Sequence, residues 1–326
     1  MRIEYQMNEF LNSCVEKGLS KKTCKSYEQT LILFALYLKK THKIEDAAKV
    51  KTEMIREYLQ YIKERGKYTV VGKEHSRSYN FPENRTDYGK KVSDVTINNY
   101  LRNIKVFFHF LEDAQLIKKN PTEKIRQIKT TRKPLHFMDD SEYQKLMSSI
   151  DISKSSEYRD YVLINTLLDT GMRLGECLKT QIEDLDFKEK TIYLPAENTK
   201  GKRSRFVFFS QKLAAELKRW LQYKDRYIES NYIFPTIRGT VMQVSNFEAN
   251  LTKYAKRADL KNIHPHMLRN NFAKRFLMSG GDIYTLSKIL GHSSVEVTEK
   301  EYLDLDTKDL HRQYAAHSPL THIQTL

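Results

Sequence analysis

The sequence predicts a mainly α-helical protein of two domains, with a small β-sheet or hairpin in the second domain, an α+β fold. Apolar residues recur at helical spacing along most of the 326-residue chain. A polar, basic stretch with prolines at both ends, 120–137, separates two such helical regions. Within the second region, 185–210 has two β-prone runs, TIYLP and RFVFF, on either side of a turn that contains glycine.

The first domain, residues 1–133, is expected to be a helical DNA-binding domain that ends in a linker at about 120–133. Three amphipathic segments predict its helices, at 19–40, 51–66 and 96–117. Ser20 is the expected cap of the first of these helices. That helix places Tyr27, Leu31, Phe34 and Leu38 on one face. The third places Ile97, Leu101, Ile104, Phe108 and Leu111 on one face, so each helix has a stripe for a common core.

An insertion at about 67–94 separates the second and third of these helices. It has no helical period and is too long for an ordinary connection. Basic and aromatic residues alternate in it, and KYTVV and SRSYNF are predicted to pair as a small β-ribbon. The hypothesis is that the insertion contacts DNA beside the core site. A disordered surface loop is an equal alternative, and a protein–protein contact is a third.

The second domain, residues 134–326, is expected to be the catalytic one. Helical segments at 157–170, 211–225 and 244–260 flank the β-prone stretch. A polar tail, about 306–326, carries Leu310 and Tyr314 four residues apart. This spacing predicts a short helix that docks on a neighbouring protomer.

Charge and composition favour a nucleic-acid partner. Of the net charge of +15, residues 1–133 carry +12 (28 Lys and Arg against 16 Asp and Glu) and the remainder carry +3. A basic domain of this kind suits a polyanion such as DNA. The longest apolar run, at 31–38, is too short to span a bilayer, so no membrane role is expected. The three cysteines show no paired spacing, which fits a reducing cytoplasm.

Four short motifs carry candidate chemistry. TGMRLGE, at 170–176, breaks a helical run at Gly171 and places Arg173 at the next turn, where Glu176 could hold its guanidinium. ENTKGKRSR is a basic hairpin tip with Lys200 beside Gly201. Each motif alone is weak, because surface arginines and basic turns are usually only solvated.

The other two motifs lie near the C-terminal end. In HPHMLRNN, Pro265 fits the first position of a helix, and His266 and Arg269 share a face of its first turn, a suitable place for an anion. His264 and His266 lack nearby Cys, Asp or Glu to complete a ligand set, so no metal is expected. LGHSS predicts a helix end at Gly291, followed by His292; Tyr302 comes ten residues after this histidine.

In this order, the four motifs and the tyrosine resemble the tyrosine recombinase (phage integrase) family, including integrases and recombinases of mobile genetic elements. The resemblance covers nearly the whole chain. It implies that the helical N-terminal region is a core-binding domain and that the remainder is a tyrosine-recombinase catalytic domain. It also implies site-specific DNA recombination through a 3′-phosphotyrosyl intermediate, by a synaptic tetramer on double-stranded DNA, without a cofactor or metal.

By this resemblance, Tyr302 is the nucleophile, and Arg173 and Arg269 clamp the phosphate. Lys200 is the acid for the leaving 5′-oxygen, although Lys202 remains open for this role. His266 matches the position implicated in proton transfer with the tyrosine. The remaining two residues are His292, at the position that hydrogen-bonds the phosphate, and Glu176, as support for the arginines.

Two departures and two alternatives accompany this interpretation. Asn270 stands where many relatives have a second histidine, and the insertion at 67–94 is longer than usual. A DNA-binding protein that has lost catalysis is one alternative, and a topoisomerase-like relaxing enzyme is the other. The filled catalytic positions favour an active enzyme.

Overall fold

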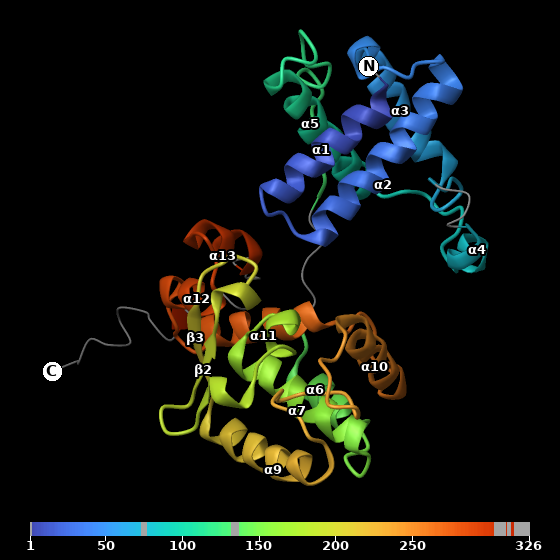
Figure 1. Cartoon of the computed structure of the whole chain (residues 1–326). Helices are drawn as coiled ribbons and strands as arrows, with labels where there is room; N and C mark the ends of the chain where they lie inside the picture. Colours follow the sequence, from blue (N-terminus) through green and yellow to red (C-terminus); the bar gives the residue numbers. More distant parts are fainter. Residues whose placement is uncertain (1, 73–76, 132–136, 303–310, 312–313, 316–326) are drawn as a thin grey trace, which may run out of the picture. The chain divides into compact units, whose positions relative to one another are not determined.

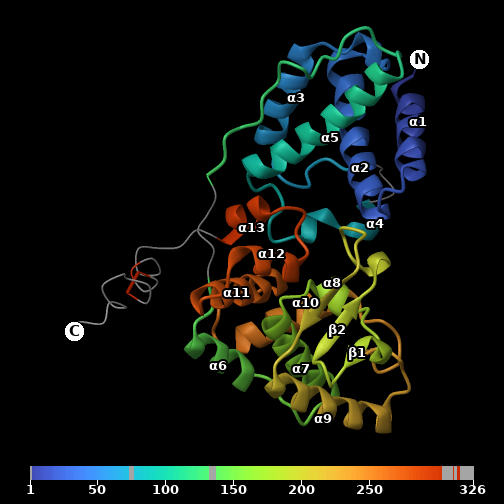
Figure 2. The ribbon, with the colours of Figure 1, turned by 90° about the vertical axis from the view of Figure 1, so that its left-hand side faces the viewer.

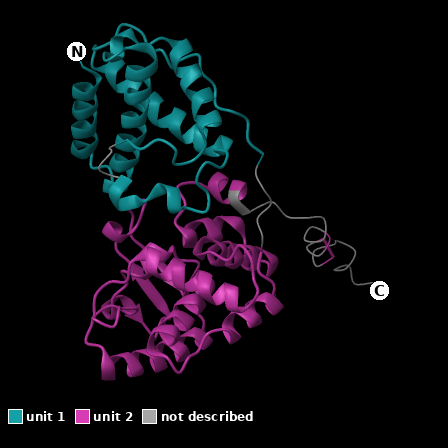
Figure 3. Ribbon diagram, turned by 90° about the vertical axis from the view of Figure 1, so that its right-hand side faces the viewer, with its two compact units in different colours: residues 1–132 teal, residues 133–326 magenta. Residues whose placement is uncertain are grey.

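The computed structural model describes residues 2–72, 77–131, 137–302, 311 and 314–315, without the side chains of Glu301 and Tyr302. The chain divides into two compact units, residues 1–132 and 133–326 (Figure 3). The tail predicted for 306–326 lies almost entirely outside the described residues. Among the described residues, every helix is too short or too polar to cross a membrane.

Unit 1 is built on four long helices, one more than the sequence patterns predict. They are α1 (Ile3–Glu16), α2 (Lys21–Tyr37), α3 (Thr52–Arg65) and α5 (Asp94–Asp113), and a π-helical turn, Leu38–His42, extends α2 (Figure 1). The predicted cap is confirmed, because the Ser20 side chain accepts a hydrogen bond from the Thr23 amide. The helix α1 was missed. Its buried face, Ile3, Met7, Phe10 and Cys14, does show the helical period.

The predicted β-ribbon in the insertion is wrong. Its second strand is instead the short helix α4 (Arg77–Asn80), followed by a 3₁₀ turn, Pro82–Asn84. Tyr68 and Phe81 both have positive φ, 61° and 37°, which extended strands do not allow. Pro82 also lacks the amide that a ladder would need. The insertion is closed at its base, where Lys67 exchanges backbone hydrogen bonds with Gly89 and Lys90, each 2.9 Å long.

Unit 2 contains a three-stranded antiparallel sheet among helices, and the predicted hairpin is confirmed. The strands are β1 (Leu185–Asp186), β2 (Thr191–Leu194) and β3 (Arg205–Phe208), with Ile192 opposite Val207. Figure 2 shows β1 and β2 with α9 beneath them. The helices are α6 (Asp140–Ser148), α7 (Ser155–Thr170), α8 (Leu174–Cys177), α9 (Gln211–Tyr227), α10 (Val244–Arg257), α11 (Pro265–Met278), α12 (Ile283–Leu290) and α13 (Val295–Tyr302).

Three hydrophobic clusters hold these elements. One, in unit 1, joins α1, α2, α3 and α5 around buried phenylalanines such as Phe34 and Phe107. The large cluster in unit 2 centres on α7, α9 and the sheet, with Trp220 fully buried. A small cluster of Ala273, Leu277, Leu286 and Leu290 joins α11 to α12. That small cluster fixes the C-terminal end of α12, which lies at the candidate site.

Candidate active site

The α7–α8 junction presents Arg173. The helix α7 ends at Gly171, whose φ of 65° lies in the left-handed region. A Cβ at Gly171 would meet a Phe272 ring carbon at 2.3 Å, so both the conformation and the contact require glycine. Arg173 follows directly before α8, and its Nη1 donates to Glu176 Oε1 at 3.1 Å. The Arg173 side chain is 31% exposed, so solvent and a ligand can reach it.

Glu176 holds two arginines, one of which the sequence motifs do not single out. Its carboxylate is 3% exposed and accepts from Arg205 Nη2 at 2.6 Å and from Arg205 Nη1 at 3.3 Å. Burial alone would raise the pKa of Glu176. The hydrogen bonds and charge of Arg205, with the charge of Arg173, outweigh burial and hold the pKa below its ordinary value. Glu176 is therefore a stable anion between two guanidinium groups.

Arg205 also ties the sheet to α12. Its Nε donates to the Ile289 carbonyl at 3.0 Å, and its side chain passes close to Gly291. A Cβ at Gly291 would lie 2.9 Å from Arg205 Cδ. The alternation of residues along β3 could have identified Arg205 as an inward-facing residue. Arg205 shares a strand face with the buried Val207, and an inward-facing arginine needs a partner.

Arg269 is buried at the same end of α12, with 2% of its surface exposed. Its Nη1 donates to the Gly171 carbonyl at 2.8 Å, and its Nη2 donates to the Leu290 carbonyl at 2.9 Å. The same Nη2 lies 2.9 Å from His292 Nε2. The predicted residues Arg173, Glu176, Arg269 and His292 are thus gathered around Gly171 and the end of α12, although they are far apart in the sequence.

The ring of His292 is oriented at both nitrogens. A guanidinium can only donate, so Nε2 of His292 must accept, and the proton of the neutral ring must be on Nδ1. Nδ1 lies 2.8 Å from the hydroxyl oxygen of Thr298, a fully buried residue on α13. Thr298 therefore accepts this proton in a hydrogen bond. Sequence motifs do not single out Thr298, although it lies four residues before Tyr302, on the same helix face.

Two of the predicted site residues, His266 and Lys200, have exposed side chains. The helix α11 begins at Pro265, as expected; His266 lies in its first turn and is exposed. His264 caps that helix, with Nδ1 accepting from the Met267 amide at 3.2 Å. Lys200 is exposed on the β2–β3 tip and forms no hydrogen bond or ion pair within the described part of the chain.

The candidate nucleophile is the last residue of α13. The backbone of Tyr302 is helical, and α13 contacts both α11 and α12 (Figure 1). Its side chain lies outside the described set. Among the described residues, no group of three or more His, Cys, Asp or Glu side chains could hold a metal ion. The site is therefore a set of cations and imidazoles around a protected carboxylate, which suits a phosphate group.

Comparison with known proteins gives matches over nearly the whole chain. Residues 136–309 match the sequence model described as the phage integrase family, and residues 7–77 match the phage integrase N-terminal SAM-like domain. Tyrosine recombinase XerC of Pediococcus pentosaceus is 27% identical over 313 residues, covering 94% of each chain. XerC of Thermodesulfovibrio yellowstonii is 27% identical over 329 residues, covering 98% of this chain and 97% of the relative.

Solved structures share the fold. The Tn1549 transposon integrase in complex with a circular intermediate DNA aligns with a TM-score of 0.72 at 16% identity, over 97% of this chain and 99% of that one. The XerH site-specific recombinase bound to palindromic difH substrate aligns with a TM-score of 0.67 at 18% identity, over 94% and 82%. The predicted mainly helical fold with a small sheet is confirmed by these likenesses.

Proposed function

The chain belongs to the phage integrase family and is a site-specific DNA recombinase, and on this premise we propose the roles of its individual residues. The observation that carries the proposal is that Arg269 joins Gly171, the end of α12 and His292, while Glu176 is held between Arg173 and Arg205. Two guanidinium groups can bind two non-bridging oxygens of one phosphate. The charge that builds on those oxygens during attack is then stabilised where it develops.

The proposed reaction begins with Tyr302. Its phenolic oxygen attacks the scissile phosphorus as the phenolic proton passes to His266. The bond from phosphorus to the 5′-oxygen breaks, and Lys200 donates a proton to that oxygen. The products are a 3′-phosphotyrosyl link and a free 5′-hydroxyl. A 5′-hydroxyl of a second strand then attacks the phosphorus and gives its proton to Lys200. The bond from phosphorus to the Tyr302 oxygen breaks, and His266 returns the proton to that oxygen, so the reaction requires neither ATP nor a metal ion.

The arrangement of the remaining groups supports this scheme. His292 lies 2.9 Å from Arg269, which supports a proposed hydrogen bond from His292 to the same phosphate, and the contact of Glu176 with Arg173 supports its proposed role of orienting that arginine. We further propose that the enzyme works as a synaptic tetramer on double-stranded DNA, because strand exchange needs paired sites with two cleavages in each. Its proposed compartment is the cytoplasm.

A nicked suicide substrate tests the proposed nucleophile. On such DNA the 5′-hydroxyl product diffuses away, so a covalent protein–DNA adduct accumulates. We expect Tyr302→Phe to bind DNA as the unaltered protein does and to form no adduct, because only the phenolic oxygen is removed. Adduct formation by this variant would refute the assignment of Tyr302.

The same assay tests the activity as a whole. Tyr284→Phe is the matched control, since it removes a phenol from an exposed residue on α12 and should leave the adduct intact. Binding without any adduct by the unaltered protein would indicate an inactive DNA-binding protein. Relaxation of supercoiled DNA without recombinant products from two sites would indicate a topoisomerase-like enzyme.

A further inference from the structure

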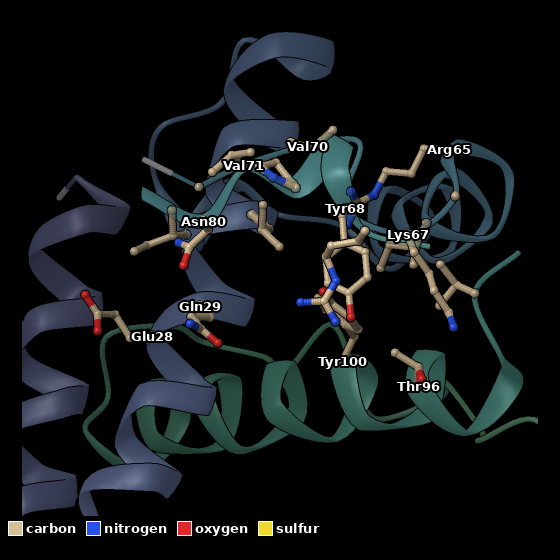
Figure 4. Close-up of a pocket in the computed structure, with 18 of the residues that line it drawn as sticks. Glu28, Gln29, Arg65, Lys67, Tyr68, Val70, Val71, Asn80, Thr96 and Tyr100 are labelled. Atoms are coloured by element: carbon tan, nitrogen blue, oxygen red, sulfur yellow. The ribbon is translucent and has the colours of Figure 1, made fainter. Parts of the chain in front are cut away.

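A cavity of about 710 Å³ lies within unit 1, beside the insertion loop, which we define as residues 66–72 and 77–92. Its volume is within the range of about 300–1,000 Å³ that is usual for ligand sites. Figure 4 shows Glu28 and Gln29 entering from α2, Thr96 and Tyr100 from α5, and Arg65, Lys67 and Tyr68 from the facing side. The insertion loop therefore covers a hollow between helices of unit 1.

The polar part of the cavity wall is strongly cationic. Lys25, Arg65, Lys67 and Arg85 line it, against the single carboxylate of Glu28. Lys67 and Arg85 share Asp87, at 3.4 Å each, which neutralises part of their charge. The excess of positive charge still favours an anionic occupant.

Arg65 lacks acceptors for two of its donors. Its Nε and Nη1 are buried and have no hydrogen-bond partner among the described residues. The guanidinium carbon lies 5.8 Å from the centre of the Tyr61 ring, a contact that orients the group but accepts no conventional hydrogen bond. Arginine stays charged, and buried N–H groups without acceptors are costly. Arg65 as a whole is half-buried at the cavity wall, so a change of its side-chain rotamer would bring these two nitrogens to an oxyanion in the cavity, which would supply the missing acceptors.

The insertion loop is held in a conformation that costs free energy. Gly66 approaches Gly89 so closely that a Cβ would lie 2.4 Å from the Gly89 carbonyl oxygen. Tyr68 and Phe81 adopt positive φ, which is uncommon for bulky residues and tends to occur at functional sites. Both rings stay exposed, at 40% and 54%. The Arg85 guanidinium lies over the Tyr68 ring at 4.2 Å, at the cavity.

We propose that this cavity receives a backbone phosphate of the DNA that flanks the cleavage site, with Arg65 as its principal ligand. The proposal rests on the recombinase function above, which supplies DNA as the substrate. DNA fits better than a small anion, because residues 1–133 carry a net charge of +12 and the partly exposed Tyr68 ring lines the cavity. The insertion loop is then an additional DNA contact, separate from the catalytic residues.

Salt dependence of DNA binding by the full-length protein tests the phosphate contact. The double variant Arg65→Gln with Arg85→Gln should bind about tenfold more weakly, because charge-assisted hydrogen bonds are lost. Its log–log salt slope should be shallower by about 0.9, the value for one phosphate. The control, Lys43→Gln with Lys49→Gln, removes the same charge from two exposed lysines that do not line the cavity. It should keep the slope. Equal slopes for the unaltered protein and the cavity variant would overturn the proposal.

A scan of the DNA with single neutral methylphosphonates locates the phosphate. A methylphosphonate at one position outside the cleavage site should weaken DNA binding by the unaltered protein. The same substitution should not weaken binding by the cavity variant any further. Equal losses for both proteins at every position would contradict the proposal. Should the double variant fail to fold, Arg85→Gln alone serves, since that side chain is 52% exposed.

Cleavage of the nicked substrate separates this proposal from the proposed function. The cavity variant should need about tenfold more DNA than the unaltered protein to reach half of its maximal rate of adduct formation, whereas the Lys43→Gln, Lys49→Gln control should not. A loss of maximal rate without any change in this DNA concentration would place the cavity in the catalytic machinery and contradict the proposal. Failure of the unaltered protein to form adduct would refute only the catalytic proposal. The methylphosphonate scan measures DNA affinity, so it tests the phosphate contact at the cavity whether or not the protein cleaves DNA.

Discussion

At the residue scale, His292 is the group whose protonation the surroundings constrain most closely. Without DNA, Arg269 requires Nε2 to accept, so the proton is on Nδ1. A hydrogen bond from Nε2 to a phosphate needs a proton there, hence the other tautomer or an imidazolium. The hydroxyl of Thr298 can accept or donate by rotating, so it can serve each of these states. We therefore propose that Thr298 positions the ring of His292.

This role predicts a clear effect of Thr298→Val. The residue is fully buried, and valine has nearly its volume, so folding should be preserved. We expect the rate of adduct formation to fall by about tenfold, by analogy with weakened general acid–base or oxyanion groups. DNA affinity should change little, and Thr298→Ser should restore the rate. Single-turnover cleavage measured across pH tests this, since only a role through His292 alters the shape of the pH profile.

At the element scale, the C-terminal end of α12 organises the site. Its last carbonyls, from Ile289 and Leu290, accept from Arg205 and Arg269. Gly291 adopts a φ of 66°, which ends the helix and leaves room for Arg205. The helix end thus holds two arginines from elements far apart in the sequence, and small changes there should reach both.

Alanine at Gly291 should be more harmful than alanine at another glycine of positive φ. Gly280 has a φ of 90°, and a Cβ added there would have nothing within 4 Å, so Gly280→Ala reports the backbone strain alone. We expect it to cost about 1 kcal/mol of unfolding free energy. Gly291→Ala should cost about 2 kcal/mol or more, because Arg205 must also move. Denaturant unfolding with parallel cleavage assays compares them, and equal losses would contradict the proposed steric contact.

The β2–β3 tip carries both lysines, Lys200 and Lys202, that are candidates for the proposed acid. Thr199 closes the tip, since its hydroxyl accepts from the Arg203 amide at 3.1 Å. Lys200 lies directly after it, and Lys202 has a φ of 50°. Both lysines are exposed, so the tip must approach DNA before either can act.

Chemical rescue distinguishes the two lysines. If Lys200 is the acid, Lys200→Ala should slow cleavage by about 10²-fold or more. A substrate with sulfur in place of the bridging 5′-oxygen has a leaving group that needs no acid, and it should restore the rate. Arg173→Ala should not be rescued, because it affects the non-bridging oxygens. Rescue of Lys202→Ala in place of Lys200→Ala would transfer the role to Lys202.

At the scale of the whole molecule, binding and chemistry are expected to reside in different units. Each unit has its own hydrophobic core among the described residues, and the charge is concentrated in residues 1–133. All the site contacts named above lie within unit 2. Independent cores allow independent folding.

Separate fragments test this division. A fragment of residues 134–326 should form adduct on nicked DNA, but with weaker binding and a shallower salt slope than the full chain. A fragment of residues 1–133 should bind DNA without cleaving it. Circular dichroism checks that each has folded. Failure of both fragments to fold alone would show that the units depend on each other for stability.

Much of the fold and several site residues could be predicted from local patterns. The Ser20 cap, the Gly171 and Gly291 helix ends and the start of α11 at Pro265 are set by residues within one turn of each other, so short motifs report them. The insertion could not be predicted in this way. Its β-prone segments contain Tyr68 and Phe81, whose positive φ is incompatible with a strand. Its conformation also depends on the hydrogen bonds of Lys67 with Gly89 and Lys90, residues about twenty positions away, which no local pattern reports.

Local patterns of residues therefore predict the helical periods, the hairpin, the basic first domain and the ordered motifs that mark the family. Which side chains meet depends on the three-dimensional fold. Arg205 donates to Glu176, 29 residues away in the sequence, and Arg269 donates to the Gly171 carbonyl, 98 residues away. These contacts form because the fold brings the ends of α7 and α12 close to strand β3. The physical reason is that the side-chain periods of helices and strands are set by neighbouring residues. A buried charge instead pairs with whichever group lies near it in space, and the order of residues does not encode that proximity directly.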